Sequence, residues 1–118
     1  MSNDCVFCKI VKGEINCEKI WEDDDFLAFF DVHPVTEGHT LVIPKKHFEN
    51  IFDIGGDISE KYISALQKVG KILMERYQCE GFNIFLNNGE VAGQVVGHVH
   101  FHLFPRKKGD NFKLTFLK

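Results

Sequence analysis

The sequence lacks an apolar run long enough to cross a membrane, and its first residues, MSNDCVFCK, lack the hydrophobic segment of a signal peptide. It also lacks a basic face. The net charge is -3, and lysine and arginine cluster only at positions 45–46 and 106–108, whereas a nucleic-acid surface needs a broad basic patch. We therefore expect a cytoplasmic protein that binds neither membranes nor nucleic acids.

No repeat or low-complexity segment divides the chain, and we expect one domain over residues 1–118. A hydrophobic content of 44%, with 12 phenylalanines, is enough for a core. The predicted elements are a short helix ended by Gly13, strands over 18–22, 26–31 and 39–44, a long helix over 57–77 with an Asp57–Glu60 capping box, and strands over 82–88 and 98–105. This order predicts an α+β domain, in which helices pack on one side of an antiparallel sheet.

The stretch HVHFHLFPR, residues 98–106, has histidine at every second position at its start. A strand would place His98, His100 and His102 on one face. Such an array has a structural, a metal-binding and a catalytic interpretation. At about 3.3 Å per residue, His98 and His102 lie roughly 13 Å apart, so one zinc ion with bonds of ~2.0 Å cannot bind all three rings. We therefore expect the three histidines to have different roles.

A glycine-rich loop precedes these histidines, with Asn87-Asn88-Gly89 followed by Gly93-Gln94. Glycine lets the backbone approach a ligand and offer N–H groups to phosphate oxygens, although many loops are rich in glycine. Imidazole titrates near neutrality and can act as a nucleophile, a proton donor or an anion ligand. The loop and the histidines together predict an imidazole that attacks phosphorus while neighbouring donors stabilise the developing charge.

The four cysteines are not expected to form disulfides in the cytoplasm. Cys5 and Cys8 are spaced as two thiolates on one helical turn, which is half of a tetrahedral zinc site. The alternative is a pair of reduced thiols packed beneath the helix. Cys17 and Cys79 are isolated, and we interpret them as buried or incidental thiols.

Together these motifs resemble the histidine triad family. HVHFHLF matches the family's His-x-His-x-His signature, and CVFCKIVKGE, FLAFFDV, EGHTLVIPKKH and LNNGEVAGQ occur in the family's order and spacing along nearly the whole chain. The chain is most similar to the small nucleotide-binding branch, in its bacterial-type form with an N-terminal Cys-x-x-Cys. His102 favours a hydrolase, because a related transferase branch has glutamine there. The resemblance implies the HIT-like fold: an antiparallel five-stranded sheet with one long and one short helix.

The resemblance also implies a role for each matching residue. His100 would be the nucleophile. It would attack the α-phosphorus of a conjugate of a purine nucleoside monophosphate, AMP or GMP. His102 would bind phosphate and handle the proton, with His39 close by, and Asp31 would hold the ribose hydroxyls. The remaining matches are Asn87, Gly93, Gln94 and Val95 on the phosphate side and Val6, Phe7, Ile10, Phe29 and Val32 around the base. Each of these apolar residues has plain core packing as its alternative interpretation.

In the matching branch, two histidines complete the zinc site begun by the cysteines. The resemblance thus implies one structural zinc ion per chain, bound by Cys5, Cys8, His47 and His98, and a homodimer related by a two-fold axis. One position departs from the family, which often has serine after Gly-Gln. This chain has Val95 there, which keeps the backbone N–H but not the hydroxyl and so bears on substrate preference or rate.

Three functions fit these residues to different degrees. The first is hydrolysis of nucleoside phosphoramidates or related conjugates, with dinucleoside-polyphosphate hydrolysis as a close alternative. The second is a zinc-containing nucleotide-binding regulatory module with weak catalysis, which Val95 favours and the intact His100 and His102 disfavour. The third, a purely structural zinc protein, does not explain His39, Asp31 or the glycine-rich loop.

Overall fold

The computed structural model describes residues 4–114, so residues 1–3 and 115–118 of the expected domain lie outside the described part. Five antiparallel strands form one sheet in the order β1-β2-β3-β5-β4. The elements are α1 (Val6–Val11), β1 (Lys19–Glu22), β2 (Phe26–Phe30), β3 (Thr40–Pro44), η1 (Ile51–Asp53), α2 (Gly56–Tyr77), β4 (Gly81–Leu86), η2 (Glu90–Ala92) and β5 (Phe101–Arg106). The predicted α+β class, with five strands, one short helix and one long helix, is confirmed.

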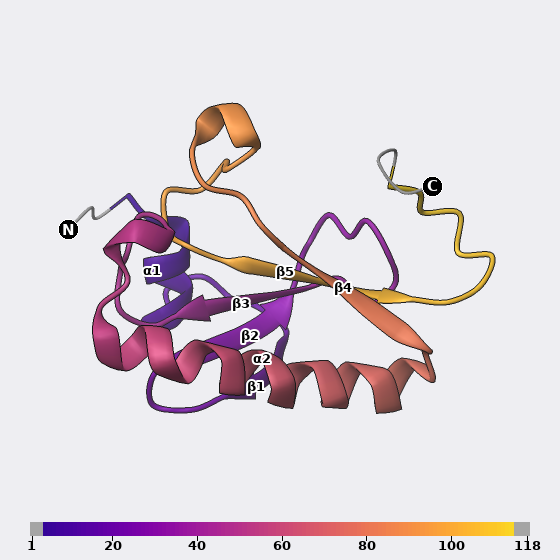
Figure 1. The fold of residues 1–118 in the computed structure, drawn as a ribbon. Coiled ribbons are helices and arrows are strands. Elements are labelled where there is room, and N and C mark those ends of the chain that lie inside the picture. The colour runs from indigo at the N-terminus through magenta and orange to yellow at the C-terminus, as the bar shows by residue number, and fades with distance from the viewer. Residues whose placement is uncertain (1–3, 115–118) are drawn as a thin grey trace.

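The long helix α2 covers one face of the sheet and lies below it in the view of Figure 1. The core on this side joins Tyr62, Ala65, Leu66, Val69 and Leu73 of the helix to Phe26, Ala28, Val42 and Leu103 of the strands. The Tyr62 hydroxyl donates to the Val42 carbonyl at 2.6 Å, which ties the helix to β3. Within residues 4–114, no helix is both long and apolar enough to span a membrane.

The start of α2 differs from the prediction. Gly55 is the N-cap and makes no side-chain cap bond, so the predicted Asp57–Glu60 capping box is wrong. Because the helix begins at Gly56, Asp57 lies inside its first turn, where a carboxylate interacts favourably with the helix dipole. A capping box forms instead at η1, between Asn50 and Asp53.

The short helix α1 packs against the opposite face of the sheet, so the expectation that the helices share one side is wrong. Its core joins Cys5, Phe7, Cys8 and Ile10 to Leu27, Phe29, Leu41 and Ile43. Successive residues of β2 and β3 are buried almost without interruption, and a strand with two apolar faces needs cover on both.

The last strand begins at Phe101 rather than at His98, so the expected strand over 98–105 is wrong at its start. Pairing with β3 ends at Val42 opposite Phe101. Continued pairing would bring in Pro44, which has no N–H to donate. The Val99 N–H instead donates to the Phe48 carbonyl at 2.8 Å. The segment before β5 therefore leaves the sheet and runs toward α1 and the loop after β3.

Candidate active site

Four metal-ligand atoms from separate parts of the chain meet beside α1. The Cys5 Sγ lies 3.3 Å from the His98 Nδ1, and the Cys8 Sγ lies 3.3 Å from the His47 Nδ1 and 3.6 Å from the His98 Nδ1. All four ligand atoms lie within 4.8 Å of one another. A tetrahedral zinc ion with bonds of about 2.3 Å to sulfur and 2.0 Å to nitrogen has sulfur–nitrogen edges of about 3.5 Å. The predicted Cys2His2 set therefore has the geometry that a zinc ion needs.

The protonation of this cluster also suits a metal ion. The His98 Nε2 lies 2.8 Å from the Pro44 carbonyl oxygen, which only accepts, so Nε2 carries the proton and Nδ1 presents its lone pair to the thiols. Burial lowers the pKa of His98 to about 4, so its ring is neutral at pH 7. Burial raises the pKa of the Cys8 thiol to about 11, so a nearby cation is needed to hold the thiolate.

His100 directs a nitrogen lone pair away from the backbone. Its Nδ1 lies 2.8 Å from the His98 carbonyl oxygen, so Nδ1 carries the proton and Nε2 is the nucleophilic atom of the neutral ring. The Phe7 ring packs edge-on against it, with centroids 5.0 Å apart. Burial lowers the pKa of His100 below 6.5, although the hydrogen bond to His98 and the charge of Asp31 act in the opposite direction.

His39 sets the tautomer of His102. The His39 Nδ1 accepts the Val35 N–H at 3.1 Å, so the proton of its neutral ring sits on Nε2. This Nε2–H donates to the His102 Nδ1 at 2.9 Å, which leaves the His102 proton on its own Nε2. Burial lowers the pKa of His39 and lowers that of His102 to about 4. Both rings are therefore neutral hydrogen-bond donors at pH 7.

The carboxylate of Asp31 lies 3.6 Å from the His39 Nε2, and Asp31, His39 and His102 come close enough to hold a metal ion. A ligating nitrogen needs a free lone pair, however, and the Val35 contact leaves the His39 Nε2 protonated. We therefore interpret this group as a hydrogen-bonded chain and not as a second metal site.

A cavity of about 480 Å³ opens beside His100 and His102 on the face opposite α2. Most of the predicted site residues line it: Val6, Phe7, Ile10, Phe29, Asp31, Val32, Asn87, Gly93, Val95, His100 and His102. Its mainly apolar walls end at polar groups around the histidines, an arrangement suited to a flat apolar base joined to an anion. Val32 and Val95 are 83% and 92% exposed, so they form the rim and not the floor.

Besides the four metal ligands, two predicted residues do not line this cavity. The first is His39, which contacts the wall residue His102 through the hydrogen bond between their rings. The Gln94 side chain braces the glycine-rich loop, because its Nε2 donates to the carbonyls of Glu49 and Val96, and its Oε1 accepts the Gly89 N–H at 2.8 Å. The backbone at Gly89 and Gly93 has φ of 91° and 98°, which favours glycine. The phosphate contact expected of Gln94 stays a prediction.

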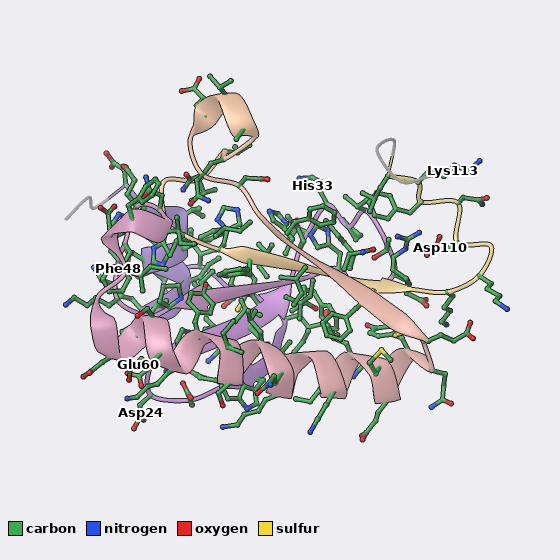
Figure 2. All side chains as sticks on the ribbon, in the orientation of Figure 1. Asp24, His33, Phe48, Glu60, Asp110 and Lys113 are labelled. Atoms are coloured by element: carbon green, nitrogen blue, oxygen red, sulfur yellow. The ribbon has the colours of Figure 1, made fainter. Side chains whose placement is uncertain are left out.

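Sequence reasoning missed several wall residues: Ile15, Asn16, Cys17, Phe30, His33, Leu41 and Val96. Leu41 pairs with His102 in the sheet, so its place depends on a register that the sequence does not specify. His33 lies in the loop after β2, on the side of the sheet opposite α2 (Figure 2). Its N–H donates to the Asp31 carboxylate at 2.9 Å, which helps to orient that carboxylate.

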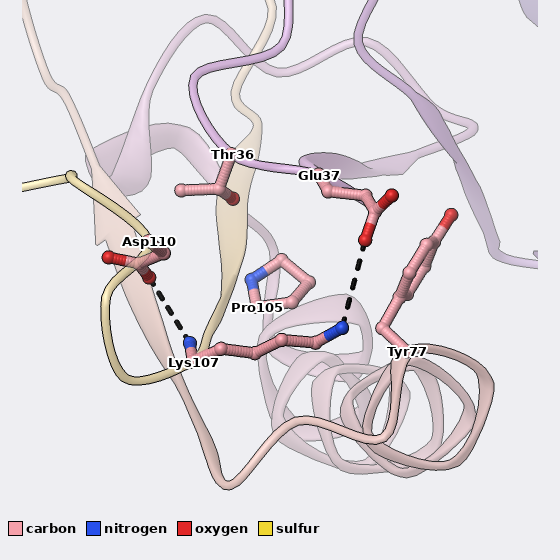
Figure 3. A pocket seen from close by; sticks show the side chains of 6 residues that line it. All are labelled: Thr36, Glu37, Tyr77, Pro105, Lys107 and Asp110. Carbon is pink, nitrogen blue, oxygen red and sulfur yellow. Dashed lines mark hydrogen bonds and ion pairs between the residues drawn. The ribbon is translucent and has the colours of Figure 1, made fainter.

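A smaller cavity of about 250 Å³ has different chemistry (Figure 3). It is lined by Thr36, Glu37, Tyr77, Pro105, Lys107 and Asp110. The Lys107 ammonium lies 3.8 Å from the Glu37 carboxylate, and the Lys107 N–H donates to Asp110. These walls carry neither histidine nor cysteine, whereas the larger cavity is lined by His100 and His102.

The chain is similar to known proteins over most of its length. The family model for the HIT domain matches residues 12–109. "Protein hit" of Bacillus subtilis is 44% identical over 112 residues, covering 94% of this chain and 77% of the relative. "Adenosine 5'-monophosphoramidase HNT1" of Candida albicans is 41% identical over 107 residues, covering 87% and 70%.

Solved structures resemble the chain closely. A HIT family protein from Bacillus subtilis superposes with a TM-score of 0.91 at 42% identity, covering 98% of this chain and 83% of that one. A "ZN-bound histidine triad family protein" from Mycobacterium smegmatis gives 0.88 at 38% identity, covering 94% and 81%. The fold and the site thus define a histidine triad protein. The chain belongs to the HIT domain family.

Proposed function

We propose that the protein is a nucleotidyl hydrolase that cleaves purine nucleoside monophosphate conjugates, phosphoramidates foremost, at the α-phosphorus. The observation that carries the proposal is the hydrogen bond from the His100 Nδ1–H to the His98 carbonyl, which leaves the Nε2 of this cavity-lining ring with a free lone pair. A relative 41% identical is named an adenosine 5'-monophosphoramidase, which supports the same substrate class.

In the proposed reaction, the His100 Nε2 bonds to phosphorus while the bond from phosphorus to the leaving amine breaks. The amine departs with the bonding electron pair and takes up a proton from solvent, while the neutral His102 donates a hydrogen bond from its Nε2–H to the phosphate. The His98 carbonyl stabilises the positive charge that His100 gains. Water then attacks phosphorus, loses a proton to solvent and releases His100 as neutral imidazole.

The other predicted residues bind the nucleotide in this proposal. Asp31 holds the ribose hydroxyls. Phe7, Ile10 and Phe29 contact the base, and the loop at Asn87 and 93–95 binds the phosphate.

A brief exposure of the protein to an adenosine phosphoramidate, followed by mass measurement, should detect one AMP group per chain, located on His100 by peptide mapping. An adduct on any other residue, with none on His100, would contradict the mechanism.

The acid limb of the pH–rate profile should lie below pH 6.5. His100 must be neutral to attack, and burial lowers its pKa from 6.5, so kcat/KM should stay level as the pH falls to that value and decrease only below it. Asp31 raises the pKa of His100, so Asp31→Asn should move the limb to still lower pH. Asp24→Asn, at an exposed carboxylate, is the matched control and should leave the limb in place. A limb at or above pH 6.5 would contradict the assignment.

Val95→Ser should raise kcat/KM for the phosphoramidate by about tenfold, because a hydrogen bond to a charged group contributes roughly 1.5–3 kcal/mol. The residue is 92% exposed on the cavity rim, so the free energy of unfolding should change by less than about 0.5 kcal/mol. Val91→Ser, at a fully exposed residue in η2, is the control and should leave both unchanged. Unchanged kinetics in Val95→Ser would mean that the hydroxyl is irrelevant here.

Two alternatives use the same cavity. Dinucleoside-polyphosphate hydrolysis is the same attack with a nucleotide as leaving group, and parallel turnover assays with diadenosine tetraphosphate separate it from phosphoramidase activity. A zinc-containing regulatory module with weak catalysis is favoured by Val95, which leaves the cavity rim without a hydroxyl. AMP binding without turnover of either substrate would support the module.

We also propose one structural zinc ion per chain. Cys5, Cys8, His47 and His98 would hold it. Because all four positions of this site would be taken by protein ligands, the ion would stabilise the structure and leave no position for a substrate.

The expected homodimer is supported by β4, which is an edge strand with Ile84 exposed, since free edges pair readily. Light scattering on the purified protein would test it. The single domain over 1–118 and the cytoplasmic location stay predictions.

A further inference from the structure

The short helix α1 takes part in both the Cys2His2 cluster and the nucleotide cavity. Cys5, its N-cap, and Cys8 supply the sulfur ligands, while Val6, Phe7 and Ile10 form a cavity wall. The helix has only 6 residues, and helices shorter than about 12 residues are marginal by themselves. The position of this wall therefore depends on what α1 contacts.

Those contacts are of two kinds. Phe7 and Ile10 pack against strand residues such as Leu27 and Phe29. The other contact is the cluster itself, where sulfur and nitrogen atoms face one another. Without an ion, thiols and imidazoles form weak hydrogen bonds, whereas coordination joins the helix to both histidines and contributes directly to folding. Metal loss would therefore remove the stronger of the two attachments.

His98 provides a second connection between the two sites. Its Nδ1 belongs to the cluster, while its backbone carbonyl accepts the Nδ1–H of His100. The Phe7 ring packs edge-on against both imidazoles, with centroids 5.7 Å from His98 and 5.0 Å from His100. A shift of α1 or of His98 would thus disturb the cavity wall and the nucleophile together.

We infer that zinc in the Cys2His2 cluster and nucleotide in the cavity are thermodynamically linked, so that each increases the affinity for the other. This inference rests on the proposed function. The four ligand residues are distinct from the residues that line the nucleotide cavity, so the coupling runs through α1 and His98 and not through shared contacts. Linkage requires the same coupling factor in both directions.

The test uses AMP and zinc with the full chain. Calorimetry gives the AMP dissociation constant of the zinc-loaded and the chelator-stripped protein, and competition with a chelator of known affinity gives the zinc dissociation constant with and without saturating AMP. We expect about tenfold weaker AMP binding without zinc and about tenfold tighter zinc binding with AMP. AMP affinities within about twofold of each other overturn the linkage. If the zinc-loaded chain does not bind AMP, the proposed function fails as well.

Two variants distinguish coupling through α1 from general unfolding of the zinc-free chain. Phe7→Leu should keep the zinc affinity measured without AMP while reducing the coupling factor below about threefold. Phe52→Leu makes the same substitution at a phenylalanine of η1 that is 88% exposed, and it should keep the full factor. An undiminished factor in Phe7→Leu would overturn the assignment to α1.

Discussion

Replacing His100 by alanine is expected to lower AMP release from an adenosine phosphoramidate by about 10⁴-fold or more, because it removes the atom that attacks phosphorus. The neighbouring rings cannot substitute for it. The His98 Nδ1 faces the two thiols, and the His102 Nδ1 accepts a hydrogen bond from His39. Single-turnover release of AMP, measured by chromatography, gives the rate.

AMP binding serves as the internal control for His100→Ala. The apolar wall and the Asp31 carboxylate are untouched, so the AMP dissociation constant should change by less than about fivefold, or roughly 1 kcal/mol. Thermal unfolding of the variant checks that the fold persists. Free imidazole should restore part of the release, since it fits the space left by the ring. Turnover by the variant near the parent rate would assign the attack to another group.

That the three histidine rings do not share one set of neighbours was predictable, because a strand spacing of about 3.3 Å per residue prevents one ion from reaching all three rings. The structure places His98 beside the cysteines and His102 beside His39. The point at which the histidine segment, residues 98–102, joins the sheet was not predictable in the same way. His98 and His100 precede β5, since pairing with β3 stops short of Pro44. Alternation in sequence indicated an extended chain but could not show where sheet pairing ends.

The apolar half of the cavity was predictable only through resemblance. From the residues alone, Phe7, Ile10 and Phe29 are as consistent with core packing as with base binding, and all three are buried in the core beneath α1. They belong both to the core and to the cavity wall, because α1 covers only part of its face of the sheet and the cavity lies beside it. The contact from Val35 to His39, which fixes the tautomers, depends on the fold of the loop over 31–38. No periodicity in the sequence encodes that loop.

Cys5→Ser is expected to remove the zinc ion and to lower the midpoint of thermal unfolding by about 10 °C. A ligand present at 100 times its dissociation constant stabilises the folded state by about 2.7 kcal/mol, and a domain of this size loses about 4 °C per kcal/mol. The Cys5 Sγ both contacts His98 and accepts the Cys8 N–H as the N-cap of α1. The substitution therefore weakens the metal site, while a serine hydroxyl can still cap the helix.

The control for this prediction is Cys79→Ser, which makes the same substitution at a buried thiol outside the metal cluster, beside Met74. Elemental analysis should find about one zinc per chain in the parent and in Cys79→Ser and much less in Cys5→Ser. Only the parent and Cys79→Ser should lose stability when a chelator is added, because Cys5→Ser has no ion left to lose. A parent chain that stays metal-free in supplied zinc, or a Cys5→Ser chain that unfolds at the parent temperature, would show that the cysteines are packed thiols and that α1 is held by its apolar contacts alone.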